Sequence, residues 1–118
     1  MSNQRSFQRA DRVSQQVHEE VARLFLTEIN DPRVQGLQIT DVEMTPDLRN
    51  ARIYYAMRDD EEVPEDMGEV LDGVAGFVRS QLASRLKLKY VPEIRFYYDE
   101  AVRRGRRIDD LLSNLRDD

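Results

Sequence analysis

Cysteine is absent from this chain of 118 residues, and histidine occurs once, at His18. Without cysteine there is no disulfide, no thiolate nucleophile and no cysteine-ligated metal. The single histidine stands beside Glu19 and Glu20 on the polar side of a predicted helix, which is typical of a solvated surface residue rather than a general base. The sequence also lacks a metal-spaced ligand set and a phosphate-binding glycine loop. We therefore expect no catalytic residues, no metal and no cofactor.

Long apolar runs are missing as well. No stretch approaches the ~20 residues that a membrane-spanning helix needs. The N-terminal MSNQRSFQRADR has no apolar centre of the kind found in signal peptides. Apolar residues make up 40% of the chain and charged residues 35%, which predicts one globular domain with a core of its own. We expect a cytoplasmic protein without a membrane partner.

Charge is distributed unevenly along the chain. From Gly76 to Arg107, nine basic residues oppose three acidic ones, so this segment carries +6 in a chain whose total is −5. An acidic protein repels phosphate at long range and does not bind nucleic acid indiscriminately, but a local cationic face is compatible with a specific site. We predict contacts with RNA phosphates by the nine basic residues, Arg79, Arg85, Lys87, Lys89, Arg95, Arg103, Arg104, Arg106 and Arg107.

Negative charge gathers in residues 59–69 (DDEEVPEDMGE), where seven of eleven residues are acidic. We interpret this acidic segment as a solvated loop that leads into a helix N-terminus, where carboxylates interact favourably with the helix dipole. It could also discourage RNA from lying on that side of the protein.

The first part of the chain predicts a tail and a helix. The polar residues 1–8 are expected to form a flexible tail, and the domain is expected to span residues 9–116. Apolar residues then recur at helical spacing as far as Asn30. The helix should stop there because the residue before Pro32 disfavours helical geometry.

A hairpin is predicted next. From Gly36 the apolar period changes to two, and its phase shifts in a way that a bulge near Thr40–Asp41 would reconcile. Residues 45–48 have the composition of a turn, and residues 51–57 alternate again as a half-buried strand.

The second half predicts a long helix that is interrupted once. A single apolar phase continues from Met67 to about Leu88 and includes Gly73 and Gly76. Each glycine costs roughly 1 kcal/mol relative to alanine in a helix interior, which suggests a kink or a close backbone approach. We place the kink at Val74, Ala75 and Gly76.

A third strand and a last helix complete the pattern. Residues 94–98 alternate after Pro92, which suits the first position of a strand because no ladder donor is needed there. An apolar stripe over 108–115 predicts a last helix that begins near residue 100. The class is α+β, a single type II KH-like domain in the order α-β-β-α-kink-α-β-α. It would have a three-stranded sheet with the helices packed on one face.

The sequence Gly73-Val74-Ala75-Gly76 spells G-x-x-G, the loop with which KH domains clamp single-stranded nucleic acid. A working clamp usually carries a basic or polar residue between its glycines. Here the middle residues are apolar, Asp72 precedes them, and the helical phase runs straight through. We therefore predict the KH-like topology with a kinked helix in place of the clamp.

The chain resembles the ribosome-binding factor A family, bacterial factors that assist assembly of the small ribosomal subunit, over nearly its whole length. The most specific stretches are 40–49 (TDVEMTPDLR), 76–79 (GFVR), 86–96 (LKLKYVPEIRF), 99–100 (DE) and 105–109 (GRRID). Members of this family have a type II KH-like fold in which an A-x-G kink between two helices replaces the clamp. Val74 stands here in place of the first alanine of that motif.

The resemblance implies a function. It implies that the protein binds the free, immature small ribosomal subunit and its ribosomal RNA, and assists late maturation and 5′-end processing of that RNA. It also implies support of growth in the cold and release with the help of an assembly GTPase. We expect a monomer, since the sequence contains no heptad pattern and no exposed apolar stripe.

Several alternatives remain open. Lys87 and Lys89 would also suit a helix C-terminus, whereas four cations at 103–107 oppose the dipole of a helix that begins there. Tyr54 and Tyr97 either stack on bases or pack beneath neighbouring side chains. For the function, the alternatives are a general KH-type single-stranded RNA-binding protein, a protein-only adaptor, and a hydrolase that uses carboxylates alone.

Overall fold

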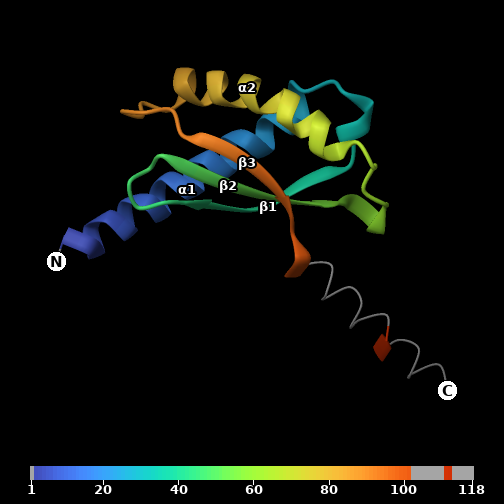
Figure 1. Ribbon diagram of the computed structural model, residues 1–118, viewed down its shortest axis with the longest axis horizontal. Coiled ribbons are helices and arrows are strands. Elements are labelled where there is room, and N and C mark those ends of the chain that lie inside the picture. Colours follow the sequence, from blue (N-terminus) through green and yellow to red (C-terminus); the bar gives the residue numbers. More distant parts are fainter. Residues whose placement is uncertain (1, 102–110, 113–118) are drawn as a thin grey trace.

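Two long helices cover one face of a three-stranded sheet (Figure 1). The computed structural model describes residues 2–101 and 111–112. The strands lie in the order β1-β2-β3, with β1 antiparallel to β2 and β2 parallel to β3. The elements are α1 (Ser2–Thr27), β1 (Leu37–Met44), β2 (Asn50–Met57), α2 (Met67–Arg85) and β3 (Glu93–Tyr98), with short 3₁₀ helices at Pro32–Val34 and Arg58–Asp60. The predicted α+β class, the three strands and the one-sided placement of the helices are confirmed.

The core lies between the helices and the sheet. Helix α1 contributes a stripe of apolar residues spaced three or four apart, as an amphipathic helix requires. Its most buried side chains, none more than 2% exposed, are Ala10, Val17, Val21 and Leu24. The fully buried Val78 and Leu82 face them from α2, and Ile53 from the middle strand. In the described part of the chain no helix is both long and apolar enough to cross a membrane.

The two ends of α1 differ from the prediction. The helix begins at Ser2, inside the segment 1–8 that was predicted to be a tail, and the domain limits 9–116 stay a prediction. It ends at Thr27, somewhat before Asn30, because the carbonyl of Leu24 accepts hydrogen bonds from two successive amides and closes the last turn. The chain is then already extended at Asp31, as the residue before a proline must be.

The bulge predicted in β1 is confirmed. The register between β1 and β2 shifts between Ile39 and Asp41, which returns Val42 and Met44 to the buried face. The bulge is held from two sides: the Thr40 hydroxyl donates to Asp99 at 2.6 Å, and Nε2 of His18 lies 3.2 Å from the carbonyl oxygen of Ile39. His18 is therefore half-buried against the sheet rather than fully solvated as predicted.

The kink predicted at Val74, Ala75 and Gly76 does not divide the helix, and α2 runs through these residues as one element. Glycine keeps its backbone amide donor, so the helical hydrogen bonds continue through these residues. The glycines only lower the helix propensity of the segment. Figure 1 shows the α2 ribbon changing direction between its yellow and its gold half, so the helix bends without breaking. Because residues 73–76 are helical, they form no G-x-x-G loop, which agrees with the prediction of a KH-like fold without its clamp.

Strand β3 begins at Glu93, directly after the buried Pro92, close to where the alternation predicted it. The last helix, predicted from about residue 100, is described only at Glu100, Ala101, Leu111 and Leu112, which are all helical. Its remaining residues lie outside the described part of the chain.

Candidate nucleic-acid interface

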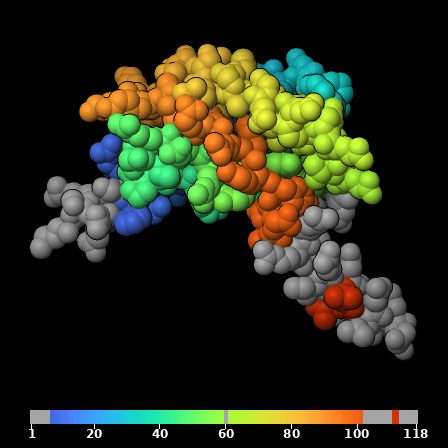
Figure 2. Space-filling model, in the orientation of Figure 1, coloured from blue at the N-terminus to red at the C-terminus, as the bar shows by residue number. Residues whose placement is uncertain are grey.

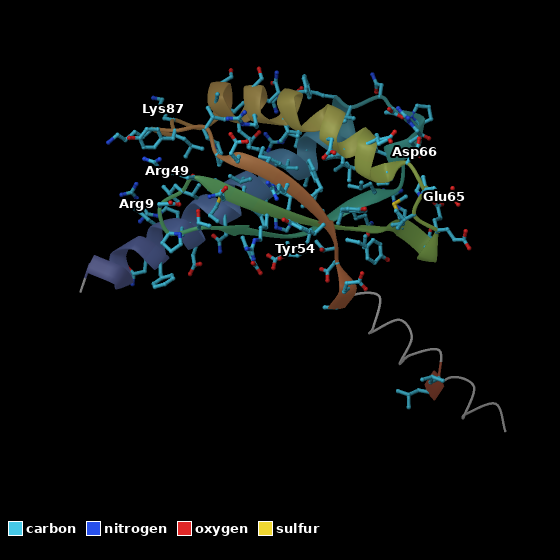
Figure 3. The ribbon with its side chains drawn as sticks, in the orientation of Figure 1. Arg9, Arg49, Tyr54, Glu65, Asp66 and Lys87 are labelled. Carbon is cyan, nitrogen blue, oxygen red and sulfur yellow. The ribbon has the colours of Figure 1, made fainter. Side chains whose placement is uncertain are left out.

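A basic depression lies at one end of the molecule, with a volume of about 530 Å³. Three segments that are distant in sequence line it: α1, the β1–β2 turn and the segment that follows α2. Figure 3 shows Arg9, Arg49 and Lys87 gathered at this end, and Figure 2 shows surfaces of the blue, green and orange segments side by side there. The lining residues are Arg9, Arg12, Val13, Gln16, Asp47, Leu48, Lys87, Leu88, Lys89 and Tyr90, so four cations face one carboxylate.

The segment after α2 presents both lysines to solvent because its leucines are anchored. The helix ends when Leu86 turns to extended geometry, with its amide still bonded to the carbonyl of Leu82 at 2.8 Å. Leu86 and Leu88 pack against the core, so the alternating Lys87 and Lys89 point outward and are exposed. Lys87 lies at the centre of a tight turn, in which the Leu88 amide donates to the Leu86 carbonyl at 2.8 Å, and the two packed leucines hold this turn against the core.

Tyr90 forms the aromatic wall of the depression. The guanidinium carbon of Arg49 lies 5.0 Å from its ring centroid, and Nζ of Lys89 lies 5.5 Å from it. Both distances are typical of cation–π contacts, which hold a charge in place without neutralising it. The tyrosine is 49% exposed, so one ring and two positive charges are available together to a ligand.

The β1–β2 turn positions Arg49. The carboxylate of Asp47 accepts hydrogen bonds from the Thr45 hydroxyl at 2.6 Å and from the Arg49 amide at 3.1 Å. The Thr45 hydroxyl and the Arg49 amide together hold the pKa of Asp47 below its usual value. Leu48 takes the left-handed geometry, φ 62°, that this tight turn needs. Asp47, the one acid that lines the depression among the described residues, thus serves to shape the turn.

Two of the predicted phosphate contacts have partners inside the protein. Arg79 donates from Nε to the carbonyl of Pro92 at 3.0 Å and forms an ion pair with Glu93 at 3.4 Å. It therefore fixes the point at which the segment that carries Lys87 and Lys89 enters β3. Arg85 bonds to both Glu20 and Glu28 on α1, and these carboxylates raise its pKa. Both arginines join elements of the fold, and a phosphate would have to compete with these bonds.

The other predicted contacts fall in three places. Lys87 and Lys89 lie in the depression, while Arg95 is exposed on the face of the sheet that no described helix covers. Arg103, Arg104, Arg106 and Arg107 lie outside the described residues.

Arg9, Arg12 and Arg49 were not predicted as contacts, because they lie far along the chain from the basic segment. A signal was present for two of them: Arg9, Arg12 and Gln16 follow the i, i+3, i+7 spacing that places polar residues on one face of a helix. Nothing in the local sequence marks Arg49, which enters the site only through the hairpin turn.

The opposite end of the molecule is acidic. Figure 3 shows Glu65 and Asp66 there, far from Arg9 and Lys87. Arg33 lies between two acids, 2.8 Å from Asp31 and 3.0 Å from Asp66. The hydrogen bond from the Arg33 side chain lowers the pKa of Asp31 to about 2. In the described part of the chain no cluster of His, Cys, Asp or Glu could hold a metal ion.

Comparison with known proteins gives a consistent result. The family model of ribosome-binding factor A matches residues 9–112. The ribosome-binding factor A of Desulfatibacillum aliphaticivorans is 39% identical over 94% of this chain and 90% of its own length. That of Chromohalobacter salexigens is 42% identical over 92% of this chain and 84% of its own length.

Solved structures support the same fold. The solution structure of a Thermotoga maritima protein described as a putative ribosome-binding factor A is 28% identical, with a TM-score of 0.63 over 75% of this chain and 85% of that one. The crystal structure of the Thermus thermophilus factor is 20% identical, with a TM-score of 0.66 over 75% of this chain and 93% of that one. A model of the Thermus thermophilus factor has also been fitted into the map of a 30S complex, and it shares the fold with a TM-score of 0.61. On the family match and on the identity to its relatives, the chain belongs to the ribosome-binding factor A family.

Proposed function

We propose that this protein binds the free, immature small ribosomal subunit through the basic depression and assists late maturation of that subunit without catalysing a reaction itself. The observation that carries the proposal is the set of unneutralised cations at one end of the molecule. Among the described residues, no carboxylate forms an ion pair with Arg9, Arg12, Arg49, Lys87 or Lys89. Four other arginines, Arg23, Arg33, Arg79 and Arg85, do form such pairs.

Phosphate is the ligand that this charge pattern favours. Lysine and arginine side chains that contact phosphates release the counterions condensed on a nucleic acid, and this release drives binding. The depression is concave, and its lining cations come from two segments that are distant in sequence, with Arg49 of the β1–β2 turn beside Tyr90. A folded RNA backbone therefore fits it better than a single isolated phosphate. The 30S complex of the Thermus thermophilus factor supports the choice of the small subunit as the RNA-bearing partner.

Finer features of the proposal follow from the family. We propose that maturation includes processing of the 5′ end of the ribosomal RNA, that the protein acts as a monomer in the cytoplasm and supports growth in the cold, and that an assembly GTPase helps to release it. Membership in the ribosome-binding factor A family supports these features together. The helical state of residues 73–76 argues against the alternative of a general KH-type RNA clamp.

The test is sedimentation of the purified chain with small subunits, large subunits and assembled ribosomes over a series of salt concentrations. One variant carries Lys87→Ala and Lys89→Ala. Its matched control carries Arg23→Ala and Arg58→Ala, which removes the same charge from exposed positions away from the depression.

We expect the unchanged chain to sediment with free small subunits only. The lysine variant should bind roughly 30-fold more weakly near ~0.1 M salt, with a salt slope shallower by about 1.5, since two phosphate contacts are removed. The control should bind like the unchanged chain. Equal weakening of both variants would contradict the role of the depression, and equal binding to large subunits would reduce the function to general RNA affinity.

A further inference from the structure

The face of the sheet away from α1 and α2 carries an aromatic pair beside a pair of arginines. Tyr54 on β2 and Tyr97 on β3 are register partners, and their rings lie 5.8 Å apart at an interplanar angle of 34°. Figure 3 shows Tyr54 on the side of the sheet opposite α2. Arg52 and Arg95, also register partners, precede the two tyrosines by two positions and share their face. Both arginines are exposed, and Tyr97 is 40% exposed.

Packing does not account for this arrangement. The core on the other face already holds Ala51, Ile53 and Tyr55 of the middle strand. In the row of Tyr54 only the small Ala56 is buried among the described residues of β2, whereas Tyr54 is half-buried and Arg52 is exposed. Among the described residues, no carboxylate forms an ion pair with Arg52 or Arg95. Two unneutralised cations beside an exposed aromatic ring are the combination that contacts the phosphate and the base of an unpaired nucleotide.

Acids on β1 and on β3 border this face. Glu43, on β1, is the register partner of Arg52 and lies 3.5 Å from the Tyr54 hydroxyl. The carboxylate of Asp41 accepts a hydrogen bond from the Val42 amide at 2.8 Å. On β3, Glu93 is paired with Arg79, and Asp99, two residues after Tyr97, accepts a hydrogen bond from the Thr40 hydroxyl. Both acids are therefore bonded within the protein, whereas Arg95 is exposed beside Tyr97. A phosphate backbone is therefore favoured along β3 and disfavoured along β1.

We propose that this open face is a second RNA contact, at which one unpaired base stacks on Tyr97 while Arg52 and Arg95 bind the adjoining phosphates. The inference rests on the proposed function, since it takes RNA as the partner, but it names a separate surface. Tyr54 would support the ring of Tyr97 from β2, and its hydroxyl contact with Glu43 would fix its own orientation. The depression would then bind folded RNA by charge, and the sheet would bind one extruded nucleotide by stacking.

The experiment uses the full chain and a short single-stranded RNA in which one base is replaced by 2-aminopurine, whose fluorescence falls when it stacks. We expect the fluorescence to fall on binding, the fall to be lost in Tyr97→Ala and kept in Tyr97→Phe. Affinity should drop about tenfold in Tyr97→Ala. The Arg95→Gln variant should bind more weakly and show a shallower salt dependence. Thermal unfolding of each variant establishes that it is folded.

Lys87→Ala combined with Lys89→Ala is the control that separates the two surfaces. If the sheet is the stacking site, this variant binds small subunits about 30-fold more weakly but keeps the fall in fluorescence. A fall that persists in Tyr97→Ala, or that disappears only in the lysine variant, would move stacking to Tyr90 and overturn the inference. Absence of any fall with the unchanged chain would overturn it too, and the sedimentation result would stand independently.

Discussion

The two ends of the molecule carry opposite charges and treat them differently. At the acidic end Arg33 is bonded to both Asp31 and Asp66, so part of the charge is neutralised within the protein. At the basic end the lining acid, Asp47, is bonded to the β1–β2 turn, and among the described residues the surrounding cations form no ion pair with a carboxylate. The net charge of −5 is therefore unevenly distributed over the surface, with positive charge at one end and negative charge at the other. Such a charge distribution orients the protein on RNA with its basic end inward.

The largest expected effect comes from reversing charge at the two ends separately. Lys87→Glu with Lys89→Glu should weaken binding to small subunits by about 100-fold or more near ~0.1 M salt, because two contacts are lost and two repulsions are added. Glu62→Lys with Glu65→Lys changes the net charge by the same amount in the opposite direction, at exposed positions of the acidic end. It should strengthen binding by less than about tenfold. If the glutamate-to-lysine variant gained as much affinity as the lysine-to-glutamate variant lost, net charge alone would determine binding. Sedimentation of both variants at one salt concentration distinguishes these outcomes.

Arg79 joins the folded core to the basic end, and its replacement should weaken both. Arg79→Ala removes the bond to the Pro92 carbonyl at 3.0 Å, which should lower the free energy of unfolding by about 1 kcal/mol. It should also raise hydrogen exchange in residues 86–92 and weaken RNA binding severalfold. Arg79→Lys keeps the charge but loses the planar fork. If Arg79 bound phosphate as a simple charge, the lysine variant would bind RNA normally; we expect it to be impaired.

The two glycines of α2 should be replaceable at a gain in stability. A Cβ at Gly73 or at Gly76 meets nothing within 4 Å, so alanine adds helix propensity without a clash. We expect each change to add roughly 1 kcal/mol to the free energy of unfolding, measured by urea denaturation. Gly36→Ala is the contrasting control: its φ is 86° and the new Cβ would lie 3.0 Å from Oε2 of Glu61, so it should destabilise. A loss of stability in Gly76→Ala would show that the bend in α2 needs glycine.

The smallest effect is a pH dependence at the acidic end. The pKa of Asp31 is lowered from 3.8 to about 2 by its bonds with Arg33. A lowered folded pKa means that this carboxylate contributes stability above about pH 3.8 and that the contribution is lost as the pH falls toward about 2. Asp31→Asn should lower Tm at neutral pH by a small amount, since the pair is exposed, and the difference should vanish near pH 2. A constant difference from pH 2 to 6 would contradict the assignment.

The sequence was sufficient for the elements whose signal is local. The shift of apolar phase in residues 37–44 predicted the bulge, because side chains alternate across a strand and an extra residue is the way to restore the buried face. The alternation at 94–98 predicted β3 for the same reason. The kink at residues 74–76 was inferred from two glycines and from the family motif, and α2 stays one continuous helix there because a glycine weakens a helix without removing a hydrogen-bond donor.

Only part of the candidate site could be predicted from the sequence. Lys87 and Lys89 stand in a basic segment and were predicted, and they do line the depression. Arg79 and Arg85 belong to the same segment but are bonded to Pro92 and to two glutamates of α1, partners that no local pattern identifies. The count of charges along the sequence gives these four residues equal weight, because it contains no information on which cations form ion pairs in the folded protein.

The sequence by itself determined the class, the order of the elements and the family, because apolar periodicity and the stretches at 40–49 and 86–96 are local properties of the chain. Only the tertiary structure decided which charges remain available. It brings Arg9 and Arg12 of α1 and Arg49 of the turn to Lys87 and Lys89, and it places Tyr54 beside Tyr97 on an open face. The physical reason is that an ion pair or a ring contact depends on distances of a few ångströms, and those distances are set when helices and strands pack together, not by spacing along the chain.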